Sequence, residues 1–174
     1  SALVSRGVVA LSYTSCAGPC RIFMTSPAAV LGAALIVGGA VGDNIRADSA
    51  DGVIRALDAR TGRLLWRLVT IPEHMSTATG GADVWPPFTV DADRNMVFLP
   101  TGSPSVDVYG VNRSDPIPYA NALLAVDGAT GRVIWHQQLV HHDLFDFDLP
   151  DQPMLVDVRR GGEVIPAVIQ ITKM

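Results

Sequence analysis

The sequence has few of the features that identify nucleic-acid-binding, zinc-binding or membrane-spanning proteins. Its formal charge is −4, so no excess of basic residues supports binding to nucleic acid. It has two cysteines, Cys16 and Cys20, and no second Cys/His pair follows at the spacing of a zinc site. A disulfide between these cysteines stays open. The longest apolar run, residues 28–42, is shorter than the roughly 20 residues of a membrane-spanning helix.

The composition instead favours short strands joined by turns. Hydrophobic residues make up 48%, and there are 16 glycines and 12 prolines. Apolar stripes with the period of a helix are hard to find, so an all-β fold is expected. Strands are predicted within residues 1–24, 25–42 (a hairpin turning at Leu31-Gly32), 53–57, 96–99 and 122–126.

An internal repeat gives the clearest sign of architecture. Residues 56–66 and 125–135 share the frame A-Φ-D-x-x-T-G-R-Φ-Φ-W, where Φ is apolar. The frame predicts a strand, a turn held by Asp with Gly at a positive φ, and a strand ending in Trp. Repeated hairpins of this kind are typical of β-propeller blades. Trp66 and Trp135 are therefore interpreted as structural. The offset of the copies predicts an insertion, for which residues 101–121 are the candidate.

The segment 140–150 contains the residue types that are expected at a functional site. It holds two histidines and three aspartates, with four large apolar residues between them. A surface loop would leave those apolar side chains in water, and a core strand would bury unpaired charges. We expect a loop that enters a cavity, where carboxylates meet a cation or a substrate hydroxyl. The alternative is an Asp-rich turn that caps local amides.

Trp85 stands outside the repeat. It precedes Pro86 and Pro87, which fix an extended chain. A rigidly held indole at this place suits a stacking platform, and a core tryptophan is the alternative.

These residues resemble those of a known family. The repeat frame resembles the tryptophan-docking motif of quinoproteins that use pyrroloquinoline quinone (PQQ). Val140 to Pro153 resembles the signature of the PQQ-dependent, membrane-associated glucose dehydrogenases and their quinate/shikimate relatives. The resemblance implies a partial PQQ-binding β-propeller domain over residues 1–174, from an eight-bladed ring. It also implies oxidation of a sugar or polyol, ubiquinone as electron acceptor, and a periplasmic place at the inner membrane, reached through regions outside this chain.

The resemblance also assigns roles to single residues. Asp146 corresponds to the catalytic base, and Lys173 to the lysine that contacts the reactive quinone carbonyl. For the cofactor and for a Ca²⁺ or Mg²⁺ ion the implied residues are Arg6, Thr25, Trp85, Ser105 and Lys173 (PQQ), and Asp43, Ser103 and Asp146 (metal). Asp143 and Asp148 are assigned to loop structure, and His141 and His142 receive no catalytic role.

The sequence departs from the family in three ways. Phe145 replaces a tryptophan of the signature, and Ser103 stands where many relatives have an asparagine ligand. About one blade is absent between Met24 and Thr25, and the blades after Met174 are missing, so the chain is expected to be a fragment. A non-catalytic propeller scaffold and an inactive truncated product are the alternatives. Since a partial ring exposes apolar surface, self-association is expected.

Overall fold

The computed structural model describes residues 2–5, 8–11, 22–44 and 46–174. Cys16, Cys20 and Arg6 lie outside these residues. The described part consists of fourteen β-strands and one short 3₁₀ helix, without an α-helix, as the sequence predicts. The elements are β1 (Ala2–Ser5), β2 (Val8–Leu11), β3 (Ile22–Phe23), β4 (Ala29–Leu31), β5 (Ala34–Val37), β6 (Ala40–Val41), β7 (Val53–Asp58), β8 (Leu64–Val69), η1 (Glu73–Met75), β9 (Thr89–Asp91), β10 (Met96–Pro100), β11 (Ala122–Asp127), β12 (Val133–Gln138), β13 (Met154–Arg160) and β14 (Glu163–Ile169).

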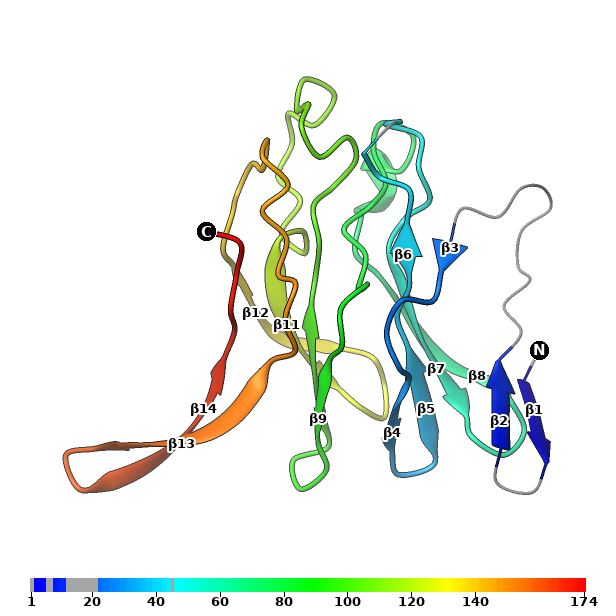
Figure 1. The fold of residues 1–174 in the computed structure, drawn as a ribbon, viewed down its shortest axis with the longest axis vertical. Coiled ribbons are helices and arrows are strands. Elements are labelled where there is room, and N and C mark those ends of the chain that lie inside the picture. The colour runs from blue at the N-terminus through cyan, green and yellow to red at the C-terminus, as the bar shows by residue number, and fades with distance from the viewer. Residues whose placement is uncertain (1, 6–7, 12–21, 45) are drawn as a thin grey trace.

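Two four-stranded antiparallel sheets form the centre of the structure. The first has the order β4-β5-β7-β8 and the second has the order β9-β10-β11-β12. In Figure 1 the two sheets stand next to one another, and one core cluster joins them. The first sheet contributes Ile36 and Ile54 to this cluster, and the second contributes Leu99 and Leu124. These sheets are two blades of the predicted propeller.

The repeated turns adopt the same conformation in both sheets. Asp58 Oδ1 accepts hydrogen bonds from the N–H groups of Arg60 and Thr61, and Asp127 Oδ1 accepts the equivalent bonds in the second copy. Gly62 and Gly131 follow with φ of 71° and 74°, a region that only glycine adopts without strain. The strand after each turn runs three residues beyond the Trp, so the prediction that it ends there was wrong.

Trp66 connects the first sheet to the second. Its indole Nε1 donates a 2.9 Å hydrogen bond to the carbonyl oxygen of Gly128. A Cβ atom on Gly131 would lie 2.6 Å from two carbons of the Trp66 ring, so only a glycine lets the indole pack there. The structural interpretation of Trp66 is confirmed.

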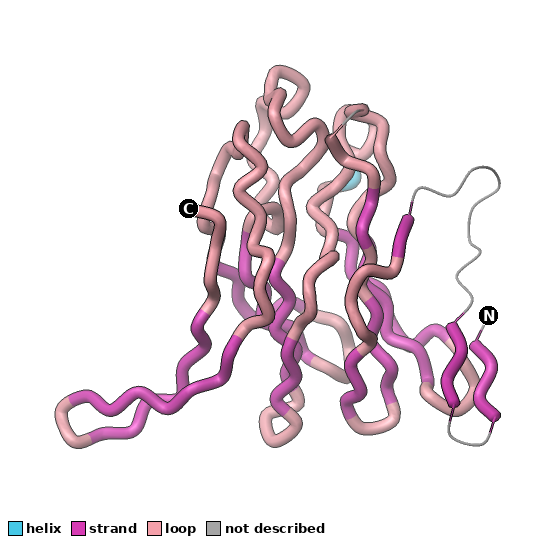
Figure 2. Tube along the Cα trace, in the orientation of Figure 1, coloured by secondary structure: helices cyan, strands magenta, loops and turns pink. Residues whose placement is uncertain are grey.

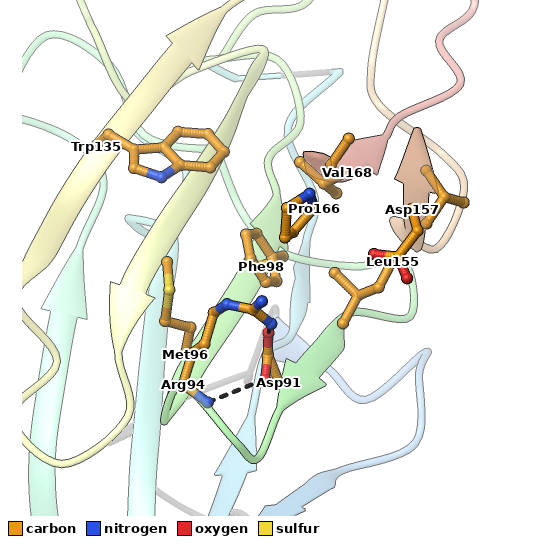
Figure 3. A pocket seen from close by; sticks show the side chains of 11 residues that line it. Asp91, Arg94, Met96, Phe98, Trp135, Leu155, Asp157, Pro166 and Val168 are labelled. Carbon is orange, nitrogen blue, oxygen red and sulfur yellow. Dashed lines mark hydrogen bonds and ion pairs between the residues drawn. The ribbon is translucent and has the colours of Figure 1, made fainter. Parts of the chain in front are cut away.

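Trp135, the equivalent residue of the second copy, packs differently. It is 39% exposed and lies 6.0 Å from Phe98, measured between ring centroids. Figure 3 shows Trp135 and Phe98 at a cavity of about 420 Å³ whose other wall is the β13–β14 hairpin. This hairpin extends away from the two sheets (Figure 1).

The predicted hairpin of residues 25–42 is only partly correct. β4 and β5 pair around Gly32, but β6 pairs with β3 instead of extending β5. The change of partner occurs at Gly38, where a Cβ atom would lie 2.2 Å from the carbonyl oxygen of Val84. Because the chain passes so close to Val84, it leaves the first sheet at this point.

Two long loops lie at the same end of the sheets, namely residues 101–121 and the loop between β12 and β13. Figure 2 shows strands mainly in the lower half of the view and loops in the upper half. Residues 101–121 join β10 to β11, which confirms the predicted insertion in the second sheet. Buried Arg113 connects this loop to the next one, because its guanidinium donates to the carbonyl oxygens of Val106 and Asp143.

No helix among the described residues combines the length and apolar character needed to span a membrane.

Candidate active site

Four loop segments meet at an open, acid-lined cavity of about 210 Å³. The first follows β6, the second precedes β9, the third is the 101–121 loop and the fourth is the segment 140–150. We call this the acidic cavity. Its lining residues are Ala40, Val41, Asp43, Asn44, Asp83, Trp85, Asp107, Asp146 and Asp148.

The crowding of carboxylates perturbs their protonation. Burial, followed by the charge of Asp107, raises the pKa of Asp43 to about 7. Burial and the charge of Asp146 raise the pKa of Asp107 to about 6. Burial and the charge of Asp43 raise the pKa of Asp83 well above its ordinary value. A bound cation would stabilise the ionised form of each group.

Two buried carboxylate oxygens at this cavity lack a hydrogen-bond partner, namely Oδ1 of Asp83 and Oδ1 of Asp107. Unsatisfied buried acceptors are uncommon and point to an ion or a donor. Oxygen-rich donor sets suit hard cations such as Ca²⁺ and Mg²⁺. Within the described residues, however, no three His, Cys, Asp or Glu side chains are already arranged to hold a metal. The donor set therefore fits a cation that takes further ligands from another bound molecule.

Lys173 is the one lysine of the sequence, and it lies beside the acidic cavity. Its Nζ donates to Oδ2 of Asp146 at 2.9 Å and to Oδ2 of Asp148 at 3.0 Å. Burial lowers the pKa of Lys173, but these hydrogen bonds and charges outweigh burial and raise it. The structure thus brings together Asp146 and Lys173, which lie 27 residues apart in the sequence.

Asp146 has an unusual backbone. Its φ is 58°, a left-handed conformation that is strained for a residue other than glycine and recurs at functional sites. Burial raises the pKa of Asp146, and the hydrogen bond from Lys173 opposes this rise. A carboxylate beside a cavity, with a raised pKa, can accept a proton from a bound hydroxyl group.

Trp85 forms the aromatic wall of the acidic cavity. Its indole Nε1 donates to Oδ2 of Asp148 at 3.3 Å. Its carbonyl oxygen accepts a 2.7 Å hydrogen bond from the hydroxyl of Thr25, which is exposed. The face of an indole is the group that a planar aromatic ligand needs for stacking. Trp85 and Thr25, which the resemblance assigns to cofactor binding, therefore lie next to each other.

The two predicted serines are placed differently. The hydroxyl of Ser103 donates to Oδ2 of Asp143 at 2.5 Å and accepts from Asn121, and the hydroxyl of Ser105 is bonded to that of Ser49. Both serines are fully buried, and neither lines the acidic cavity. A metal role for Ser103 and a cofactor role for Ser105 stay predictions that these contacts do not support.

The segment 140–150 divides into structural and cavity-lining residues. Asp143 accepts the N–H groups of Phe145 and Phe147, so its assignment to loop structure is confirmed. The same assignment of Asp148 was incomplete, because Asp148 contacts Trp85 and Lys173. His141 and His142 are exposed and do not line the acidic cavity.

Sequence reasoning missed Asp83 and Asp107, and it misjudged Asp148. The sequence offered only weak signals for them. Asp83 lies two residues before Trp85, and Asp148 lies two residues after Asp146. Residues two apart in an extended segment point to the same side, which applies to Asp83 and Trp85 but not to Asp148, because Asp146 is left-handed.

The chain is similar to known proteins over most of its length. Residues 4–174 match the family described as "PQQ: Glucose/ethanol/alcohol dehydrogenase, beta-propeller domain". The chain is 40% identical over 164 residues to the quinate/shikimate dehydrogenase (quinone) of Acinetobacter baylyi, covering 88% of this chain and 20% of the relative. It is 36% identical over 159 residues to quinoprotein glucose dehydrogenase A of Acinetobacter calcoaceticus, covering 86% and 20%. The chain thus spans about a fifth of the length of these curated relatives.

A solved structure supports the fold independently. The quinohemoprotein alcohol dehydrogenase ADHIIG of Pseudomonas putida HK5 superposes with a TM-score of 0.81 at 21% identity. The superposition covers 97% of this chain and 28% of that chain.

Proposed function

Because the chain belongs to the β-propeller domain family of the PQQ-dependent glucose, ethanol and alcohol dehydrogenases, we propose that its acidic cavity is the PQQ site of a sugar or polyol dehydrogenase. One observation carries the proposal. The hydrogen-bonded pair of Asp146 and Lys173 lies at the acidic cavity that Trp85 also lines. A base, a cation and an aromatic wall are the groups that binding and reduction of a planar quinone require.

Different residues of the chain have different roles in the proposed reaction. The indole of Trp85 would stack on the cofactor ring, and Asp43 and Asp146 would supply oxygen ligands to a Ca²⁺ or Mg²⁺ ion. Asp146 then takes the proton of the substrate hydroxyl as general base. Bound PQQ supplies the quinone that accepts the hydride.

Lys173 contributes positive charge to the same reaction. Its ammonium would donate a hydrogen bond to the quinone oxygen, which gains negative charge when the hydride is accepted. Because Lys173 is held by Asp146 and Asp148 before any ligand binds, little reorganisation is needed at that moment.

Arg6 and Thr25 belong to the proposal as groups that hold the cofactor's carboxylates. Thr25 supports it through its contact with Trp85. Glucose is the proposed substrate, and quinate or shikimate is the second candidate, because both kinds of relative match over most of this chain. The quinate/shikimate relative is described as a dehydrogenase (quinone). On this basis we propose ubiquinone as the electron acceptor of this protein. We also propose a periplasmic position at the inner membrane.

The test is a PQQ titration of the chain with Ca²⁺ present, followed by tryptophan fluorescence. We expect saturable quenching that Trp85→Ala abolishes and that Trp135→Phe leaves in place. Trp135 is the matched control because it lies at a different cavity. A folded chain without saturable quenching would contradict the proposal and would favour a non-catalytic scaffold. Dye-linked oxidation of glucose and of quinate by the full-length protein then separates the two substrates.

A further inference from the structure

Asp148 is bonded to three distant segments at once. Its Oδ1 accepts the backbone N–H of Ser103 at 2.7 Å. Its Oδ2 accepts the indole N–H of Trp85 at 3.3 Å and the ammonium of Lys173 at 3.0 Å. The backbone N–H of Lys173 also donates to the carbonyl oxygen of Asp148 at 3.4 Å.

We infer that Asp148 is the positioning residue of the proposed site, which holds the ring of Trp85 and the ammonium of Lys173 in fixed relation to each other. The inference rests on the proposed function for its meaning in catalysis. It goes beyond that function by giving Asp148, which the sequence assigned to loop structure, a specific role between the aromatic wall and the cation.

The two carboxylate partners of Lys173 are not equivalent. The side chain of Asp146 is 41% exposed, whereas that of Asp148 is 10% exposed. A buried ion pair with further hydrogen bonds is held more firmly than an exposed one, because competing water is excluded. Asp148 is therefore the more firmly held partner of the ammonium, and Asp146 is the more exposed one.

The ammonium of Lys173 is therefore held from two sides, by the buried Asp148 and by the more exposed Asp146. The shared oxygen also ties Lys173 to Trp85, since one carboxylate atom accepts from both.

The single lysine makes a direct test possible. Acylation of Lys173 by N-hydroxysuccinimidyl acetate at pH 8 is followed by mass spectrometry of the peptide that contains Lys173. In Asp148→Asn the amine loses the buried carboxylate that holds it, so it reaches the reagent more readily. The loss of one charge-assisted hydrogen bond is expected to make labelling about tenfold faster. Asp151→Asn, an exposed carboxylate three residues away, is the matched control and should label like the wild type.

The indole N–H signals in a ¹H–¹⁵N correlation spectrum test the link to Trp85. Asp148→Asn should move the Trp85 signal and leave the Trp66 signal, which reports the bond between the two sheets. Unchanged labelling together with an unmoved Trp85 signal would overturn the inference. If Asp148→Asn does not fold, Lys173→Met takes its place. It should move the Trp85 signal, because Oδ2 of Asp148 loses its second donor, and an unmoved signal would again overturn the inference.

Neither measurement needs PQQ, so the two proposals can fail separately. Loss of PQQ binding in the wild type, with labelling as expected, would reject the proposed function alone. Normal PQQ binding in Asp148→Asn, with labelling unchanged, would reject the positioning role alone. If both proposals hold, PQQ binds about tenfold more weakly to Asp148→Asn, as expected for the loss of one charge-assisted hydrogen bond.

Discussion

The indole nitrogen of Trp66 and the carbonyl oxygen of Gly128 lie 2.9 Å apart, although the residues are separated by 62 positions in the sequence. This hydrogen bond fixes the first four-stranded sheet against the turn of the second. The loops that line the acidic cavity leave from both sheets, so their relative position depends on this contact.

Gly131→Ala should destabilise the chain by about 3 kcal/mol or more, because it adds both left-handed strain and a clash with the Trp66 ring. The new Cβ atom would lie 2.6 Å from ring carbons at a φ of 74°. Gly32→Ala is the matched control, with a φ of 58° and no atom within 4 Å of its Cβ, and should cost only about 1–2 kcal/mol. Chemical denaturation measures both. Equal losses would contradict the docking role of Trp66.

Gly102→Ala should damage the acidic cavity while leaving the fold intact. Its Cβ atom would lie 2.9 Å from Oδ1 of Asp148 and 3.1 Å from Oδ1 of Asp83. These carboxylates can move aside, but doing so breaks the hydrogen bond that the backbone N–H of Ser103 donates to Asp148. We expect PQQ affinity to fall about tenfold or more. Gly42→Ala, beside Asp43 but with open space around its Cβ, is the control for the same titration. If both variants bound like the wild type, the cavity would not be the cofactor site.

The metal-free chain should be more stable at pH 5 than at pH 8. Burial raises the pKa of Asp43 to about 7, far above the 3.8 of the unfolded chain. As pH rises from about 4 to 7, the unfolded state releases the Asp43 proton while the folded state keeps it, so stability falls and then levels off. Asp43→Asn should flatten this dependence, as measured by thermal unfolding in the presence of a chelator. Added Ca²⁺ should restore stability at pH 8, and an unaltered pH dependence in the variant would contradict the assignment.

The exposed β13–β14 hairpin should mediate self-association of the isolated chain. Val158 and Ile165 face each other across its two strands, and both are more than 40% exposed. Changing them together to Glu and Lys keeps a favourable cross-strand pair and removes the apolar surface. Sedimentation velocity should show the wild type as oligomers and the double variant shifted toward monomer. A monomeric wild type would contradict the expectation.

The all-β fold and the repeated blades could be predicted from the sequence alone, because their signals are local. The turn of the repeat depends on Asp58 and on the residues that immediately follow it, so one short pattern predicts the same structure twice. The insertion at residues 101–121 followed from the spacing of the two copies. Asp146, Lys173 and Trp85 were identified through the resemblance of single segments to a family.

Only the tertiary structure decided which charges share the cavity. Asp83, Asp107 and Asp148 come from separate loops, and their proximity depends on how the two sheets pack. Burial is likewise a property of the folded chain, so the raised pKa values of Asp43 and Asp107 could not be read from the sequence. A bond such as that from Lys173 to Asp148 has a partner 25 residues away, and no local pattern specifies which of three nearby aspartates will accept it.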